Sequence, residues 1–188
     1  MSGDFRLCVA GLHTLKQALA DFRPTHVVSL VNPDLPDAAF RPGVDGAHHL
    51  VRRFYDVHRD EGHRVWQEKE GPNPAHVAAI VAFLRAALAA PPPLRLLAHC
   101  HAGASRSTAT AYIALALRHG AGREHASFEE LLVVTRKPWP NRLMIEMADD
   151  LLDRGGALLA PLDAYRARHR NRLAAYLRLY RRRMWTVP

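Results

Sequence analysis

The chain has 188 residues, of which 48% are hydrophobic and 23% charged, a balance that excludes a fully disordered protein. It contains no run of about 18 apolar residues and no charged-then-apolar leader, so we expect no transmembrane helix, no secretory signal and a cytoplasmic protein. Its two cysteines, Cys8 and Cys100, are too few and too far apart for a disulfide framework or a four-cysteine zinc site.

The net charge of +8 is concentrated near the C-terminus. Residues 161–188 contain eight arginines and one acidic residue, Asp163, whereas residues 1–160 are close to neutral. We therefore divide the chain into a domain over 1–160 and a basic amphipathic C-terminal helix within 161–188, running from about residue 162 to residue 183. We expect no nucleic acid as a partner of the domain. The apolar stripe of the helix either docks on the domain or serves one of three alternatives: an anionic membrane surface, nucleic acid or self-association.

The first half of the chain alternates between strand and helix patterns. Aliphatic and β-branched runs predict strands over residues 6–10, 26–31, 49–55 and 94–99. Apolar residues at helical spacing predict a helix over 12–22. A second helix is predicted over 74–89, with Asn73 as its N-cap, Pro74 at its first position and three prolines after its end.

The second half of the chain is predicted to be mostly helical. Helices are expected over 105–119, over 127–135 with a capping box that opens at Ser127, and from Asn141 to about residue 154. Strands that alternate with helices and then give way to helices alone indicate an α/β fold. We expect a small, mainly parallel sheet of four to five strands with helices on both faces and a helical C-terminal half.

One stretch, His99-Cys-His-Ala-Gly-Ala-Ser-Arg-Ser-Thr108, lies between a predicted buried strand and a predicted helix. A tight loop at such a junction directs backbone N–H groups into one concavity that binds a tetrahedral anion. Gly103 permits the backbone geometry that closes the loop, and Arg106 offers two parallel hydrogen bonds to phosphoryl oxygens. The same positive field favours the thiolate form of Cys100. The sequence therefore predicts a phosphate-binding loop around a nucleophilic cysteine.

The pattern His-Cys-x-x-Gly-x-x-Arg-Ser-Thr is similar to the signature of the protein tyrosine phosphatase superfamily. The short chain and the central position of the motif resemble its compact dual-specificity-type branch, including bacterial members, over about residues 5–155. The resemblance implies a fold of the protein tyrosine phosphatase type. It also implies a hydrolase of phosphorylated proteins, on phosphotyrosine or phosphoserine/threonine, with a phosphocysteine intermediate and no metal or other cofactor.

The resemblance also implies roles for individual residues. Cys100 attacks phosphorus, Arg106 holds the phosphoryl oxygens in the transition state, and Ser107 helps the thiolate leave when phosphocysteine is hydrolysed. His99 positions the backbone of the cysteine from behind the loop. The substrate phosphate is expected to lie in the loop formed by His101, Ala102, Gly103, Ala104, Ser105 and Arg106.

The family takes its general acid from the loop after the strand that precedes the signature strand. Here Asp56 follows the strand predicted over 49–55, so the resemblance assigns it the leaving-group proton and then the activation of water. Asp60 and Glu61 are the alternatives, and the long segment over 57–73 could form a lid. Asn141, in the turn Pro138-Trp-Pro-Asn141, either starts a helix or, by resemblance, braces the signature loop.

Other chemistry fits the motif less well. Low-molecular-weight tyrosine phosphatases and arsenate reductases place the cysteine near the N-terminus, and no Asp-Pro pair follows Cys100 here. The main alternative is a catalytically weak phosphate-binding module on the same fold, followed by sulfurtransferase or arsenate reductase chemistry. The loop has no lysine to favour a multiply phosphorylated inositol ring, so a phosphoprotein is preferred. We expect no metal at His99 and His101, and a core position for Cys8.

Overall fold

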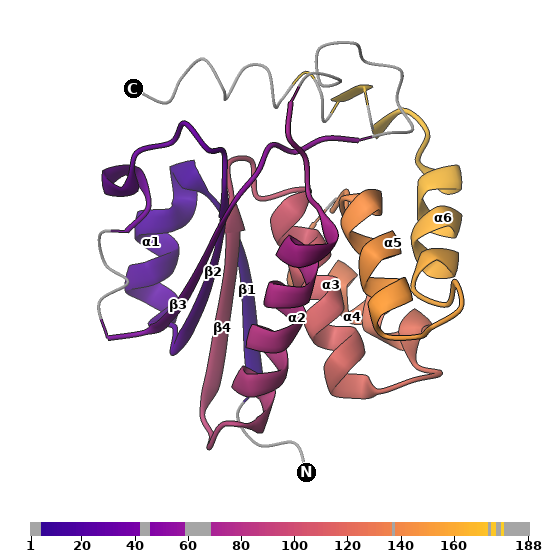
Figure 1. The fold of residues 1–188 in the computed structure, drawn as a ribbon, viewed down its shortest axis with the longest axis horizontal. Helices are drawn as coiled ribbons and strands as arrows, with labels where there is room; N and C mark the ends of the chain where they lie inside the picture. The colour runs from indigo at the N-terminus through magenta and orange to yellow at the C-terminus, as the bar shows by residue number, and fades with distance from the viewer. Residues whose placement is uncertain are drawn as a thin grey trace.

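The computed structural model describes residues 5–41, 46–58, 69–136, 138–172, 174–175 and 178. Its strands β1 (Phe5–Gly11), β2 (His26–Val31), β3 (His48–Arg53) and β4 (Leu94–Cys100) form one sheet in the order β1-β4-β2-β3. All three pairs of neighbouring strands are parallel (Figure 1). The predicted α/β class, with its small parallel sheet and helical C-terminal half, is confirmed.

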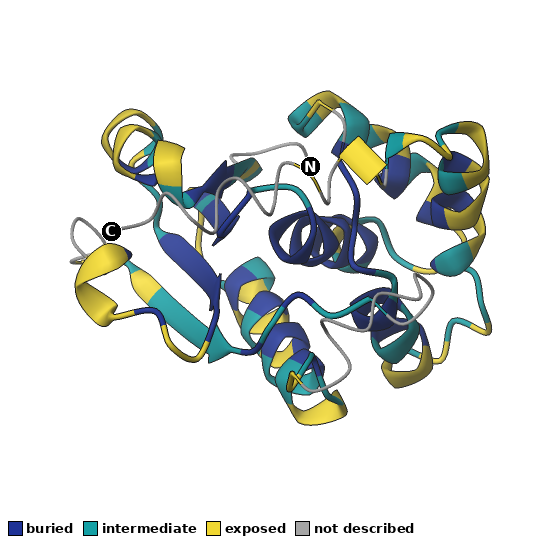
Figure 2. Ribbon diagram, turned by 90° about the horizontal axis from the view of Figure 1, so that it is seen from above, coloured by how far each residue is buried: buried dark blue, intermediate teal, exposed yellow. Residues whose placement is uncertain are grey.

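Helices cover the two faces of the sheet unequally (Figure 1). Of the helices in the described ranges, α1 (Leu12–Phe22) alone lies on one face, near the short 3-10 turn η1 (Asp37–Ala39). The other face carries α2 (Pro74–Ala89), α3 (Arg106–His119), α4 (Glu124–Val134), α5 (Arg142–Leu151) and α6 (Leu159–Arg168). We call these the α1 face and the α3 face, because α3 is buried over most of its length, at the centre of the second layer (Figure 2).

Each face has its own hydrophobic core, because side chains alternate along a strand. On the α1 face, Val27 and Leu97 pack with Leu15 and Leu19 of α1. On the α3 face, the neighbouring strand residues join a much larger core with residues of all five helices, among them Val28, Leu30, Leu96, Ile80, Tyr112, Phe128, Ile145 and Leu162. The central strands β2 and β4 are therefore apolar on both sides, as the sequence pattern indicated.

The first two helices begin and end as predicted, because their signals are local. The side chain of Asn73 accepts a hydrogen bond of 2.9 Å from the His76 N–H, and Pro74 occupies the first turn of α2. In the same way, the Asn141 side chain accepts from the Met144 N–H at 3.1 Å and caps α5.

Three predicted boundaries are wrong. Ser127 does not open a helix: α4 begins at Glu124, and the Ser127 hydroxyl donates to the Arg123 carbonyl at 2.9 Å from inside the helix. Glu124 stabilises this earlier start by accepting from the Gly122 N–H and from Arg154. Strand β3 ends at Arg53, before the predicted residue 55, and α5 ends at Leu151, before residue 154.

The prediction of one unbroken basic helix from 162 to 183 is also wrong. Helix α6 begins at Leu159 and ends at Arg168, and a turn follows over 169–171. Leu162 and Tyr165 are buried in the core of the α3 face, so the start of the basic segment packs on the domain. Residues 181–183 lie outside the described residues, and the division at residue 160 stays a prediction. No helix in the described part of the chain is long and apolar enough to cross a membrane.

Candidate active site

The signature stretch lies at the carboxyl end of β4, the edge of a parallel sheet where ligands bind in open α/β folds. Cys100 is the last residue of β4, where it pairs with Gly11 of β1 on one side and Leu30 of β2 on the other. Helix α3 begins six residues later, at Arg106. The intervening residues His101, Ala102, Gly103, Ala104 and Ser105 form a continuous bend, so the predicted strand–loop–helix junction is present.

The loop is closed against the end of β1. The Leu12 N–H donates to the His101 carbonyl at 3.0 Å, which ties the start of α1 to the loop. Gly103 has φ +71°, and a Cβ there would lie 2.6 Å from the Gly11 nitrogen. A Cβ on Gly11 would in turn lie 2.9 Å from the Ala102 carbonyl carbon. Both glycines are therefore required by close backbone contact, and Gly103 also by its left-handed conformation.

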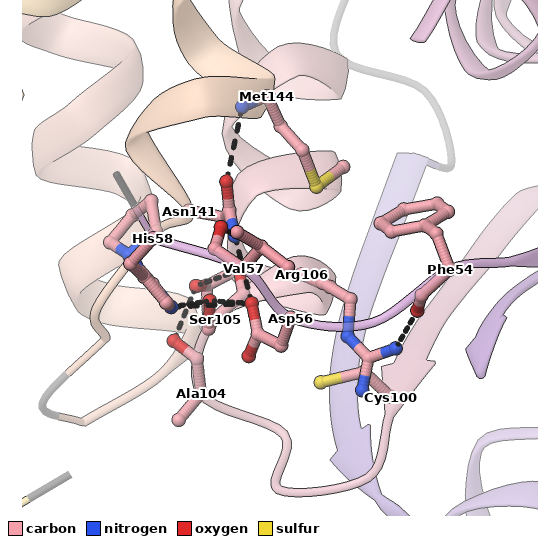
Figure 3. A network of polar contacts seen from close by, with 12 residues as sticks. Phe54, Asp56, Val57, His58, Cys100, Ala104, Ser105, Arg106, Asn141 and Met144 are labelled. Carbon is pink, nitrogen blue, oxygen red and sulfur yellow. Dashed lines mark hydrogen bonds and ion pairs between the residues drawn. The ribbon is translucent and has the colours of Figure 1, made fainter. Parts of the chain in front are cut away.

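The nucleophile candidate and its neighbours are buried at the base of this loop. The Cys100 Sγ lies 3.1 Å from the Ser107 Oγ, in the first turn of α3. Arg106 is fully buried, and its Nη1 donates to the Phe54 carbonyl at 2.6 Å (Figure 3). The guanidinium also lies over the Phe54 ring, 5.9 Å from its centroid. The residue that follows β3 thus holds the arginine beside the cysteine (Figure 3).

Asp56 lies next to the loop, two residues beyond Phe54, and is buried. Its Oδ1 accepts a hydrogen bond of 2.7 Å from the Ser105 hydroxyl and one of 2.8 Å from the Asn141 side-chain amide. The His58 Nε2 lies 3.3 Å from the same oxygen and 3.2 Å from the Ser105 Oγ. Figure 3 shows these side chains converging on one carboxylate. Asp60, Glu61 and most of the segment expected to form a lid lie outside the described residues.

The turn before α5 joins the loop to the Asp56 segment. The Trp139 N–H donates to the Ala104 carbonyl at 2.8 Å, and the Asn141 N–H donates to the Ser105 carbonyl at 3.4 Å. The Asn141 amide also donates to the Val57 carbonyl at 3.0 Å. Asn141 therefore caps α5 and contacts both the loop and the residues around Asp56.

The two histidines that flank Cys100 are both buried. The His101 Nε2 accepts from the Asn32 N–H at 3.2 Å. Burial lowers the pKa of His101 to about 3, helped by Arg106 and opposed by Asp56. His99 is on the α1 face, and burial lowers its pKa to about 3 as well, with further contributions from the nearby His49, His101 and Arg106. Both rings are neutral at physiological pH.

Sequence reasoning missed the residues behind His99. The Ser29 Oγ lies 2.5 Å from the His99 Nε2 and 2.6 Å from the His49 Nε2. A signal existed for Ser29, because it is a hydroxyl within a strand, His-Val-Val-Ser-Leu-Val, whose residues are all buried, and buried hydroxyls need partners. His58 carried no such signal, since its contact with Asp56 depends on how the chain turns after β3.

The remaining cysteine stays apart from the site. Cys8 pairs with Leu97 along β1, three positions before the pair that Gly11 makes with Cys100. It is half-buried, and burial raises the pKa of its thiol. In the described ranges no group of three or more His, Cys, Asp or Glu side chains could hold a metal ion.

No family model matches the chain, and no curated protein sequence matches it. Among solved structures, however, the chain has the fold of the protein tyrosine phosphatases. Cydia pomonella PTP-2 phosphatase aligns with a TM-score of 0.56 and 20% identity, over 80% of this chain and 90% of that one. Human DUSP28 aligns with a TM-score of 0.55 and 19% identity, over 78% and 91%.

A third structure with this fold carries a different description. The human tyrosine phosphatase-like serine/threonine/tyrosine-interacting protein aligns with a TM-score of 0.56 and 15% identity, over 77% of this chain and 89% of that one. At these identities the comparisons establish the fold alone, so the chemistry has to be argued from the residues of the site.

Proposed function

We propose that this protein is a cysteine-dependent phosphomonoester hydrolase that acts on phosphorylated proteins through a phosphocysteine intermediate. The observation that carries the proposal is the meeting of Cys100, Ser107 and Arg106 at one strand–loop–helix junction with the Asp56 carboxylate. Nucleophile, anion clamp and proton donor are the three parts that this chemistry needs.

In the first step the Cys100 thiolate attacks phosphorus, and a sulfur–phosphorus bond forms as the bond to the leaving oxygen breaks. The Arg106 guanidinium and the backbone N–H groups of the loop hold the phosphoryl oxygens as charge develops on them. Asp56 gives its proton to the leaving oxygen. Since the Oδ1 of Asp56 accepts from Ser105 and Asn141, we assign that proton to Oδ2.

In the second step the Asp56 carboxylate takes a proton from water, whose oxygen attacks phosphorus while the sulfur–phosphorus bond breaks. The electron pair returns to sulfur, and the Ser107 hydroxyl donates a hydrogen bond to the thiolate that leaves. The distance of 3.1 Å between the Ser107 Oγ and the Cys100 Sγ supports this role. Phosphate is released, and Cys100 is ready for the next turnover.

The loop and the structural neighbours support the proposed substrate class. The loop side chains between the cysteine and the arginine are small or neutral, with no lysine for additional phosphate groups. Solved structures with this fold include proteins described as phosphatases, among them Cydia pomonella PTP-2 phosphatase. We therefore propose phosphotyrosine, or phosphotyrosine together with phosphoserine and phosphothreonine, as substrate, and no metal or other cofactor in the reaction.

A phosphate-binding module with weak catalysis is the second candidate. One observation favours it: the Arg106 Nη1 donates to the Phe54 carbonyl, which leaves less of the guanidinium to follow the phosphoryl oxygens. One structure of this fold is itself described only as phosphatase-like. Turnover, rather than phosphate binding, separates the two candidates.

The test is hydrolysis of p-nitrophenyl phosphate as a function of pH in the presence of EDTA. Wild type should give a bell-shaped profile, Cys100→Ser should abolish turnover, and Asp56→Asn should lower it by about 10²–10⁴-fold while flattening the alkaline limb. Cys8→Ser and Asp150→Asn are the matched controls, since Cys8 lies apart from the loop and Asp150 is exposed on α5.

Three results would contradict parts of this proposal. Folded wild type that binds vanadate but shows no turnover would favour the binding module. Turnover that survives in Cys100→Ser would exclude the phosphocysteine intermediate, and turnover that EDTA removes would exclude a reaction without metal.

A further inference from the structure

Three side chains on three adjacent strands form a hydrogen-bonded chain behind the signature loop. Ser29 of β2 lies directly opposite His99 of β4 in the sheet, and its hydroxyl also reaches His49 of β3, with distances of 2.5 and 2.6 Å to the two Nε2 atoms. Ser29 and His99 are completely buried. The reaction proposed above uses neither Ser29 nor His49.

This network of three side chains contains one hydroxyl proton, which can be donated to only one of the two ring nitrogens. A serine hydroxyl donates one hydrogen bond and accepts others, and a neutral imidazole carries a proton on one nitrogen only. Both contacts are therefore hydrogen bonds at once only if at least one of the two Nε2 atoms is protonated, because the Ser29 oxygen can accept from both rings but its hydroxyl can donate to only one. When only one Nε2 is protonated, it donates to Ser29, and Ser29 donates to the other.

The surroundings of His99 decide which ring carries that proton. Its Nδ1 is buried and has no hydrogen-bond partner among the residues that the structure describes. A buried N–H without an acceptor is costly, so the single proton of the neutral ring belongs on Nε2. The Ser29 hydroxyl then has an acceptor among the two rings only if the His49 Nε2 is unprotonated, so the order of donation is His99 Nε2–H to the Ser29 oxygen, and the Ser29 hydroxyl to the His49 Nε2.

We propose that Ser29 and His49 are positioning residues of the candidate active site, which fix the tautomer and orientation of His99 and so anchor the last strand residue before Cys100. His49 is the end of the chain that can change. Once its Nε2 is protonated, it donates to Ser29, and the Ser29 hydroxyl loses its acceptor. Either the His99 proton then moves to the buried Nδ1, so that Ser29 donates to the His99 Nε2, or the Ser29 hydroxyl is left without an acceptor in this network.

The neighbours of His49 keep the hydrogen bonds of Ser29 with His49 and His99 intact at neutral pH. Burial lowers the pKa of His49, Arg41 lowers it further, and Asp37 opposes both. The Phe40 ring lies over the network, with its centroid 6.3 Å from the His49 ring and 6.2 Å from the His99 ring. His101 and Arg106 also lie close enough to His99 to lower its pKa. Protonation of His49, and the change in the hydrogen bonds that follows it, is therefore expected only in acid, below the usual pKa range of histidine.

The decisive measurement is the side-chain ¹⁵N spectrum of histidine-labelled full-length protein, with the His99 signals assigned through a His99→Gln variant. At about pH 7.5 we expect His99 as the Nε2–H tautomer. On acidification its ¹⁵N shifts should move together with the titration of His49. In His49→Gln, where the side-chain oxygen still accepts from Ser29, His99 should keep its tautomer and lose that step.

His48→Gln is the matched control, because His48 precedes His49 on β3 but stacks on His26, on the opposite face of the sheet. In His48→Gln the ¹⁵N shifts of His99 should still change together with the titration of His49. An Nδ1–H tautomer in wild type, or His99 shifts that do not follow His49, would overturn the proposal. So would loss of the step in His48→Gln. These readouts need no variant to be active and hold even if His49→Gln does not fold, since wild type alone decides the first two.

A second readout rests on the proposed hydrolase activity. His49→Phe removes the acceptor of the Ser29 proton, and kcat should fall about fivefold, the effect of one lost hydrogen bond, with KM unchanged. His49→Gln should restore kcat and remove the acid step of the pH profile. Equal loss in both variants would mean a merely structural role. Absence of turnover in wild type would end the hydrolase proposal, whereas the spectroscopic test would still decide this one.

Discussion

The two faces of the sheet carry different parts of the candidate site. On the α3 face lie Cys100, Arg106 and Asp56, beside a core to which five helices contribute. On the α1 face, below a single helix, lie Ser29, His49 and His99, linked by hydrogen bonds. Because neighbouring residues of a strand point to opposite faces, one step along β4, from His99 to Cys100, crosses from one region to the other.

The difference shows how each region is held in place. The α3 face is held together by a large apolar core, and its buried polar groups lie beside the loop and around Glu124 and Asp149. The smaller α1 core leaves room for a polar chain in which every hydrogen bond depends on the next. We therefore expect substitutions on the α3 face to remove chemistry, and substitutions on the α1 face to change pH dependence and stability.

After Cys100→Ser and Asp56→Asn, the largest effect is expected for Arg106→Lys on the α3 face. Lysine carries the same charge but cannot donate two parallel hydrogen bonds, and it cannot reach both the phosphate and the Phe54 carbonyl. We expect kcat to fall by about 10²–10³-fold, as when a preorganised donor is lost. Steady-state kinetics would show it, with the exposed Arg118→Lys as control. A change in KM alone would mean that Arg106 only binds substrate.

Much of the fold follows from signals that are local in the sequence. The bounds of α2 could be predicted because Asn73, Pro74 and three prolines act within a few residues of its ends. The start of α4 could not, because Glu124 is fixed by Arg154, thirty residues away, and that contact outweighs the local capping signal of Ser127.

The candidate site also has parts that local sequence signals specify and parts that they do not. The loop from Cys100 to Arg106 is a continuous motif and could be read directly. The hydrogen bond from Asn141 to Asp56 joins residues 85 positions apart and was expected only in outline, as a brace of the loop. The contacts of Ser29 with His49 and His99 depend on strand order and register, which no single segment of the sequence specifies.

The next largest effect is expected where the loop meets the end of β1. Gly103→Ala would place a Cβ 2.6 Å from the Gly11 nitrogen, at φ +71°. Left-handed strain and the backbone clash together should lower the free energy of unfolding by about 3 kcal/mol. Gly122→Ala is the control: its φ is +80°, but nothing lies within 4 Å of the added Cβ. Urea denaturation would compare them, and equal losses would show that the clash relaxes.

The smallest effect concerns the stability of the α1 face in acid. Burial lowers the pKa of His99 to about 3, whereas in the unfolded chain it returns to about 6.5. Between these two pH values the His99 ring therefore binds a proton in the unfolded state and not in the folded state. Above about pH 6.5 His99 does not change the free energy of unfolding, and below about pH 6.5 it lowers that free energy as the pH falls. At about pH 5 the loss amounts to about 2 kcal/mol.

Urea denaturation at about pH 7 and about pH 5 would test this dependence. His99→Gln should be less stable than wild type at neutral pH, because its amide replaces a hydrogen-bonded ring, but about 2 kcal/mol of the acid loss should disappear. The comparison uses the difference between two pH values, so the general cost of the substitution cancels. An unchanged acid loss in His99→Gln would mean that the ring does not stay neutral in the folded protein. The α1 face would then hold His99 as a cation, and the order of hydrogen bonds from His99 to His49 would be wrong as well.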